Sequence, residues 1–180
     1  TELFTKNKNY IFDEYHVSET NQKYVTEIKN RIKKLEGNLP THFHVKKGDF
    51  ASASEEIFSG IYPDFEQRKD NGYLVVLDPY GFQIDWSHLE RILKSGAVDV
   101  LITFQTSNIN WNQNKVQSKN ALTRMFGSGE WLDCNSAEDF VDLFCYKIIQ
   151  IPTQWKSFET KTLTVPTTKG KYHLICASRS

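Results

Sequence analysis

The sequence predicts an α/β fold with a doubly wound, mostly parallel sheet that ends in an antiparallel hairpin. Two apolar runs, Tyr73–Leu77 and Val98–Phe104, are typical of central parallel strands covered on both faces. Segments with helical spacing alternate with strand-like runs through short connections, as in a parallel α/β sheet. Near the C-terminus, two strand-like runs flank a short turn and predict a β-hairpin at the antiparallel edge.

Length and composition favour one domain. A chain of 180 residues can form one well-packed core but is short for two. Its 22 basic and 22 acidic residues give a formal net charge of zero, so the whole-chain field does not favour nucleic acid or an anionic membrane. No apolar run is long enough to span a bilayer. The three cysteines (Cys134, Cys145 and Cys176) are dispersed without a CxxC pair, so we expect a cytoplasmic protein without a disulfide framework.

The first part of the chain alternates strand and helix. The helix has apolar residues at helical spacing, with Thr20 or Asn21 as its N-cap and Gly37 at its end. The expected segments are a strand over 13–19, a helix over 21–35, a strand over 41–47, a short helix over 52–58 and a loop over 60–72.

The second part continues this alternation and ends in the hairpin. Between the two apolar strands, Trp86, Leu89, Ile92 and Leu93 recur at helical spacing, and Ser95-Gly96 ends that helix. The later expected segments are a polar excursion over 105–119, helices over 120–126 and 137–149, and strands over 161–165 and 171–177 joined by a turn over 166–170.

Candidate ligand-binding residues follow three of the expected strands. Glu19 can accept hydrogen bonds from both ribose hydroxyls of a nucleoside, Asp49 can accept from an adenine amino group, and Phe50 can stack on the ring. The third group is Asp78-Pro79-Tyr80-Gly81. Ligands of open α/β sheets bind at the carboxyl ends of the strands, so we expect all three groups to face one crevice. Helix caps and turns use the same residue types and remain the alternative for each group.

Histidines at alternating positions raise the question of a metal site. His42 and His44 lie two apart on an expected strand, with no cysteine nearby. This pattern favours a plain polar strand face over a metal site, and we expect no metal.

The order of several motifs resembles that of a known family. The motifs are Asp78-Pro-Tyr-Gly81, Trp86, Val98–Phe104, Met125-Phe-Gly127 with Trp131, and Tyr172–Ser178. Together they resemble the three-Cys-motif partner family, TcmP, which is similar in motif layout to the Rossmann-like class I S-adenosylmethionine-dependent methyltransferases. The Asp-Pro-aromatic-Gly strand end also resembles that of tRNA guanine N2-methyltransferases.

The resemblance implies a function for the strand-end residues. Asp78 and the Pro79 carbonyl would accept hydrogen bonds from an exocyclic amine of a nucleic-acid base, and Tyr80 would stack on that base. Gly81 stands where amino-directed methyltransferases usually have a second proline. Glu19, Asp49 and Phe50 would bind S-adenosylmethionine. The family name also implies a three-Cys-motif protein as a partner.

One part of the expected fold has no counterpart in the sequence. Residues 1–14 contain no glycine, whereas the resembling enzymes hold the cofactor on a glycine-rich loop after their first strand. We therefore expect a single domain over residues 1–180 that lacks this strand and loop and is N-terminally incomplete. Two functions stay open: a methyltransferase-like protein acting on an exocyclic amine of a nucleic-acid base, or a catalytically inactive module of the same fold that binds another protein.

Overall fold

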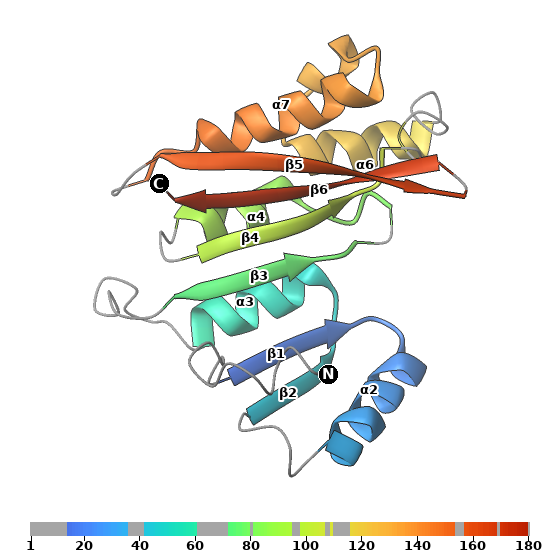
Figure 1. The fold of residues 1–180 in the computed structure, drawn as a ribbon. Helices are drawn as coiled ribbons and strands as arrows, with labels where there is room; N and C mark the ends of the chain where they lie inside the picture. The colour runs from blue at the N-terminus through green and yellow to red at the C-terminus, as the bar shows by residue number, and fades with distance from the viewer. Residues whose placement is uncertain are drawn as a thin grey trace. The chain divides into compact units, whose positions relative to one another are not determined.

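The computed structural model describes residues 14–35, 42–60, 72–79, 81–94, 98–106, 109, 116–153, 157–168 and 170–179 (Figure 1). It divides into two compact units, residues 1–56 and residues 57–180. Strands and helices alternate through both units, and the mixed α/β class is therefore confirmed. Parallel strand pairs come first in the chain, and an antiparallel hairpin ends it.

The first unit contains a β-α-β arrangement. Its elements are β1 (Glu14–Glu19), α2 (Gln22–Leu35), β2 (His42–Lys47) and the start of α3 (Phe50–Gly60). The two strands pair in parallel, with Glu14 opposite His42 and Glu19 opposite Lys47. Asn21 caps α2, because its side-chain oxygen accepts a hydrogen bond from the Lys23 amide at 2.9 Å, as the sequence predicts.

The second unit contains a four-stranded mixed sheet. Its elements are β3 (Tyr73–Leu77), α4 (Trp86–Lys94), β4 (Val98–Phe104), α6 (Val116–Phe126), the short 3₁₀ helix η3 (Glu130–Asp133), α7 (Ala137–Ile149), β5 (Phe158–Thr167) and β6 (Gly170–Arg179). The strand order is β3-β4-β6-β5, so β6 lies between β4 and its hairpin partner. The β3–β4 pair is parallel, and the other two pairs are antiparallel.

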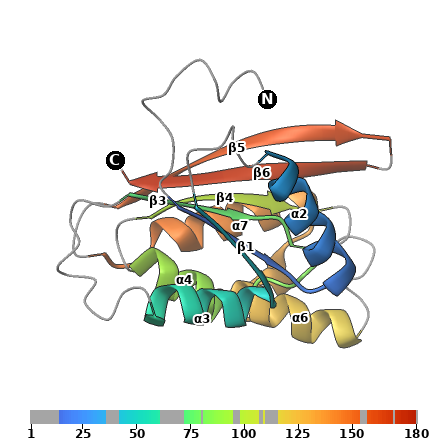
Figure 2. The same cartoon turned by 90° about the horizontal axis from the view of Figure 1, so that it is seen from below.

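The core of the second unit lies between one face of this sheet and the helices. Figure 2 shows α4, α6 and α7 on that face. Every second residue of β4 points into the core, and Val98, Val100, Ile102 and Phe104 are at most 1% exposed. Phe144 of α7 meets the ring of Phe104 at a centroid distance of 4.9 Å, which joins the helix layer to the sheet.

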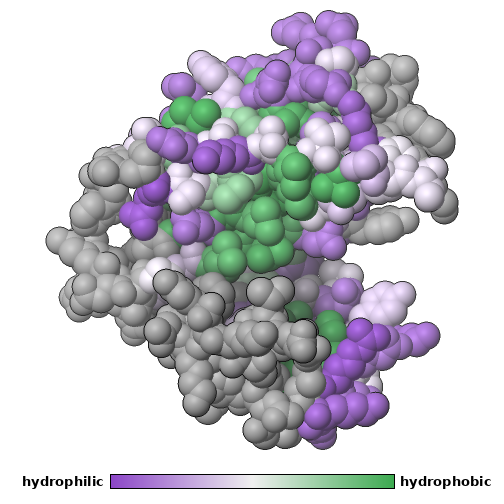
Figure 3. Space-filling view, in the orientation of Figure 1, coloured by the Kyte–Doolittle hydropathy of each residue, from purple (hydrophilic) through white to green (hydrophobic). Residues whose placement is uncertain are grey.

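The opposite face of the same sheet carries exposed apolar side chains. Leu74 and Val76 of β3 are 48% and 60% exposed, and Leu163 of β5 is 62% exposed. Leu101 and Leu174 lie between them in the strand register and are half-buried. Figure 3 shows the resulting apolar surface in the middle of the view. We call these five side chains the open apolar face.

The open apolar face corrects one expectation. The apolar run Tyr73–Leu77 predicts a central strand covered on both faces, but Leu74 and Val76 are exposed and β3 pairs with β4 alone among the described strands. An apolar sequence shows that a strand is suited to burial, but whether it is buried depends on the elements that pack against it. The expectation of a single domain stays a prediction.

Several boundaries differ from those the sequence predicts. Pro166, expected in a turn, lies within β5 and pairs with Lys171. β5 is an edge strand, where the missing amide hydrogen of proline is tolerated. α6 begins at Val116, inside the expected polar excursion, and the rest of that excursion falls largely outside the described residues. Among the described residues, no helix has the length and apolar character needed to cross a membrane.

Gly127 is a position where the packing of the core requires glycine. It follows α6 with φ of +68°, a conformation that favours glycine. A Cβ atom at this position would lie 2.5 Å from Trp86 Cδ1, closer than real contacts allow. Lys147 of α7 covers the same indole, with Nζ 5.3 Å from the ring centroid. Glycine therefore lets the end of α6 approach the start of α4.

We expect Gly127→Ala to lower the free energy of unfolding by about 3 kcal/mol. Two destabilising effects add: alanine disfavours the left-handed backbone conformation, and its Cβ atom overpacks against Trp86. The matched control is Gly81→Ala, where φ is +75° but a Cβ atom meets nothing within 4 Å. That variant should lose only about 1 kcal/mol. Urea denaturation measures both, and equal losses would contradict the packing argument.

Candidate functional site

The carboxyl ends of β1 and β2 meet at one edge of the parallel pair in the first unit. The Gly48 amide donates a hydrogen bond to the Glu19 carbonyl at 3.1 Å, which extends the ladder beyond β2. Ser18 Oγ donates to the Gly48 carbonyl at 2.8 Å. A Cβ atom on Gly48 would lie 2.9 Å from Ser52 Oγ, so this turn packs closely. The structure thus brings Glu19 and the Gly48-Asp49-Phe50 segment together.

Glu19 supports the start of α2. Its Oε1 atom accepts hydrogen bonds from the Asn21 amide at 2.7 Å and from Thr20 Oγ1 at 3.2 Å. Its Oε2 atom accepts no hydrogen bond from the part of the chain that the structure describes. A bidentate contact with a ribose needs both oxygens, whereas one is already used locally. The ribose-binding role of Glu19 stays a prediction.

Asp49 is the N-cap of α3. Its Oδ1 atom accepts hydrogen bonds from the Ser52 amide at 2.8 Å and from Ser52 Oγ at 2.7 Å. This pattern satisfies an amide that the helix itself leaves without a partner. Phe50 is the first residue of the helix and is half-buried. The adenine-binding roles of Asp49 and Phe50 stay predictions, and the alternative of helix-cap chemistry accounts for the contacts of Asp49 Oδ1.

The carboxyl ends of β3 and β4 form a second polar edge, in the second unit. Asp78 and Pro79 follow β3 directly, and the Asp78 side chain is exposed. Gln105 follows the parallel neighbour β4, and its Nε2 atom donates a hydrogen bond to the Pro79 carbonyl at 3.3 Å. Gly81 adopts its positive φ just after this edge. Tyr80 lies outside the described residues.

Gln105 and Thr106 were not predicted as site residues. Thr106 is fully buried, and its Oγ1 atom has no hydrogen-bond partner in the described part of the chain. A polar pair that directly follows a largely apolar parallel strand was the signal available in the sequence. Asp78, Pro79 and Gln105 offer a carboxylate, a carbonyl and an amide at one edge, whereas the Thr106 hydroxyl is buried beside them. Such a set can orient a polar ligand through hydrogen bonds.

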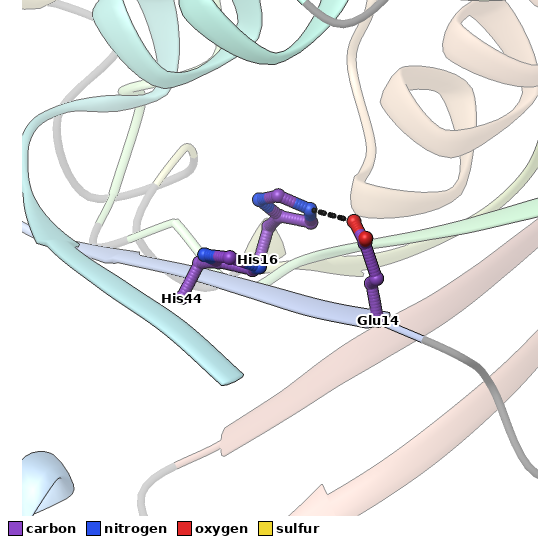
Figure 4. Close-up of side chains that lie close together, drawn as sticks. All are labelled: Glu14, His16 and His44. Atoms are coloured by element: carbon purple, nitrogen blue, oxygen red, sulfur yellow. Dashed lines mark hydrogen bonds and ion pairs between the residues drawn. The ribbon is translucent and has the colours of Figure 1, made fainter. Parts of the chain in front are cut away.

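A third group of polar side chains lies on β1 and β2, away from the strand ends. Glu14, His16 and His44 each offer a ligand atom, and these atoms all lie within 4.8 Å of one another (Figure 4). The sequence suggested His44 only together with His42, because the pairing of β1 with β2 is invisible in the sequence.

Comparisons with protein-family models, with curated proteins and with solved structures gave no match. The structure alone therefore defines the class of protein. It is a mixed α/β protein with polar side chains at the carboxyl ends of two parallel strand pairs.

We expect Asp49→Ala to lower the free energy of unfolding by about 1 kcal/mol, because α3 loses its N-cap. Asp49→Asn should retain most of the stability, since the asparagine side-chain oxygen can accept the same hydrogen bond from the Ser52 amide. Circular dichroism during urea denaturation measures both variants. Equal stability of the wild type and Asp49→Ala would contradict the capping role.

Proposed function

We propose that the chain is a methyltransferase-like protein that binds S-adenosylmethionine. In this proposal, the carboxyl ends of β3 and β4 orient an exocyclic amine of a nucleic-acid base. One observation carries the proposal: Asp78 and Pro79 follow β3 while Gln105, from the parallel neighbour β4, donates to the Pro79 carbonyl. The carboxyl ends of parallel strands are where open α/β sheets bind their ligands.

The order of elements supports this proposal. β1, α2 and β2 form one parallel β-α-β unit, and β3, α4 and β4 form another. The C-terminal hairpin then adds antiparallel pairing, as the strand-turn-strand pattern of the sequence predicts. The first unit also has acceptor groups at its own strand-end edge, on Glu19 and Asp49. Carboxylates of this kind suit the ribose hydroxyls and the amino group of an adenosine moiety.

The chemistry assigned to the Asp78 edge is positioning. The Asp78 carboxylate and the Pro79 carbonyl both accept hydrogen bonds, so they can hold the two N–H groups of an exocyclic amine. A carbonyl oxygen has two lone pairs, and Gln105 uses one of those on Pro79. The Gln105 amide thereby fixes the direction of that carbonyl. When bound, S-adenosylmethionine would supply an electrophilic methyl group. Orienting the nitrogen lone pair toward that group would allow direct transfer, without a covalent enzyme intermediate.

We expect the protein to bind S-adenosylmethionine saturably in a calorimetric titration and to transfer its labelled methyl group to RNA or DNA. Asp78→Ala should reduce transfer by about 100-fold or more, because it removes a positioning group at the reacting nitrogen. Its affinity for S-adenosylmethionine should stay close to that of the wild type. Asp142→Ala, which removes an exposed carboxylate from α7, is the matched control and should change neither quantity.

Two results of the titration would contradict the proposal. Absence of detectable S-adenosylmethionine binding by the protein would overturn the enzymatic reading. A strong loss of cofactor affinity in Asp78→Ala would instead show that Asp78 holds the cofactor rather than the amine.

The second candidate function is a catalytically inactive module that binds another protein. The open apolar face favours it, because Leu74 and Val76 of β3 and Leu163 of β5 are exposed on the same face of the sheet, with Leu101 and Leu174 between them, while the other face is packed. Contiguous apolar patches on a protein surface commonly mark protein-binding sites. The resemblance to the three-Cys-motif partner family indicates the partner, a protein with that cysteine motif.

We expect the double variant Leu74→Glu, Val76→Glu to remove binding of a purified three-Cys-motif protein, because it places two charges on the open apolar face. Both side chains are exposed, so the free energy of unfolding should change by only about 0.5 kcal/mol per site. Leu132→Glu is the control, since Leu132 is 63% exposed on η3 and outside this face. Titration calorimetry measures affinity, and unchanged binding by the double variant would exclude this face as the interface.

A further inference from the structure

The cluster of Glu14, His16 and His44 lies on one face of the parallel pair β1–β2. Glu14 and His16 are two residues apart on β1, so their side chains point to the same side of the strand. His44 is the direct register partner of His16 on β2. Figure 4 shows the three side chains together above the two strands. The cluster thus draws on both strands and needs no loop residue.

Backbone pairing and contacts hold these three residues in place. His16 Nε2 lies 3.2 Å from Glu14 Oε2, and the rings of His16 and His44 stack with centroids 4.6 Å apart. On the opposite face, Tyr15 and Phe43 stack at the same centroid distance. Cross-strand aromatic pairs of this kind stabilise the strand register. The register fixes the backbone from which all three ligands project.

We propose that Glu14, His16 and His44 form a surface site for a divalent transition-metal ion such as zinc or nickel. Two imidazole nitrogens and one carboxylate oxygen are ligands that these ions take readily. Three protein ligands leave at least one coordination position for water or a small anion. The site is independent of the proposed methyltransferase-like function, because it lies along the strands rather than at their carboxyl ends.

The ligand atoms require a small side-chain adjustment to bind an ion. Zinc takes imidazole nitrogen at about 2.0–2.1 Å, so tetrahedral ligand atoms lie roughly 3.4 Å apart. The three ligand atoms now span at most 4.8 Å. The His16 and His44 rings are nearly parallel, 14° between planes, so one ring must rotate before both nitrogens face a common point. Rotation about side-chain bonds supplies this change while the backbone ladder stays intact.

Cys134, Cys145 and His173 are less accessible as ligands. Burial raises the pKa of the Cys134 and Cys145 thiols, which disfavours the thiolate form that binds metals. His173 is buried at 4% exposure, and its Nδ1 atom lies 3.2 Å from Thr164 Oγ1. In contrast, Glu14, His16 and His44 are all on the surface, where an ion reaches them directly.

The test is calorimetric titration of the chelator-treated full chain with Zn²⁺ and with Ni²⁺. We expect one ion per chain, with affinity at least about tenfold lower in each of His16→Ala, His44→Ala and Glu14→Gln, and no saturable binding in the double histidine variant. His88→Ala, which changes a histidine of α4, is the matched control and should bind like the wild type. Circular dichroism of each variant verifies that the fold is intact.

A further measurement keeps the result specific. The absorption spectrum of the Co²⁺-loaded protein should lack thiolate charge-transfer bands, because no cysteine takes part. The proposal is overturned by wild-type affinity in the double histidine variant or by thiolate bands. A wild-type chain that binds neither ion overturns it as well.

Discussion

The packing of Phe144 against sheet and helices is the interaction on which the second unit depends. Its ring meets Phe104 of β4 at 4.9 Å, Phe126 of α6 at 5.7 Å and Trp86 of α4 at 5.6 Å. One side chain of α7 therefore contacts the sheet and both other helices of the layer. Phe104 is the last residue of β4, so the same contact fixes the strand end that carries Gln105. Through the Gln105 hydrogen bond, the core positions the carbonyl of Pro79.

The sequence predicts the elements of this core well, because burial leaves a periodic pattern. The helix over 137–149 has the bounds predicted for it, and the strand over 98–104 does too. Prediction fails where the burial of a strand face depends on which other segments of the chain pack against it. Tyr73–Leu77 is as apolar as a central strand, yet Leu74 and Val76 are exposed because no described element covers their face. The local pattern cannot encode which neighbours are present.

The candidate sites show a different limit of sequence reasoning. Glu19 and Asp49 were predicted to accept hydrogen bonds from a ligand, and in the structure each accepts them from amides at the start of a helix. Both roles need an acceptor at the same point of the chain, just after a strand and before a helix, so residue type and position cannot separate them. The His16–His44 pair was missed for another reason. Its residues lie 28 apart in the chain and meet only through the register of β1 with β2.

β3 carries the features behind both candidate functions of the second unit, and its geometry keeps them apart. Leu74 and Val76 point out of the open apolar face, whereas Asp78 and Pro79 continue beyond the end of the strand. Side chains on the face of a strand stand roughly perpendicular to the sheet, so a protein bound there approaches from a different direction than a ligand at the strand end. The Asp78 edge also includes Gln105, which directly follows β4 and donates its side-chain hydrogen bond to the Pro79 carbonyl, beyond the end of the paired strands. Protein binding and ligand binding at this sheet are therefore not mutually exclusive, and substitutions on β3 can address each without removing the other.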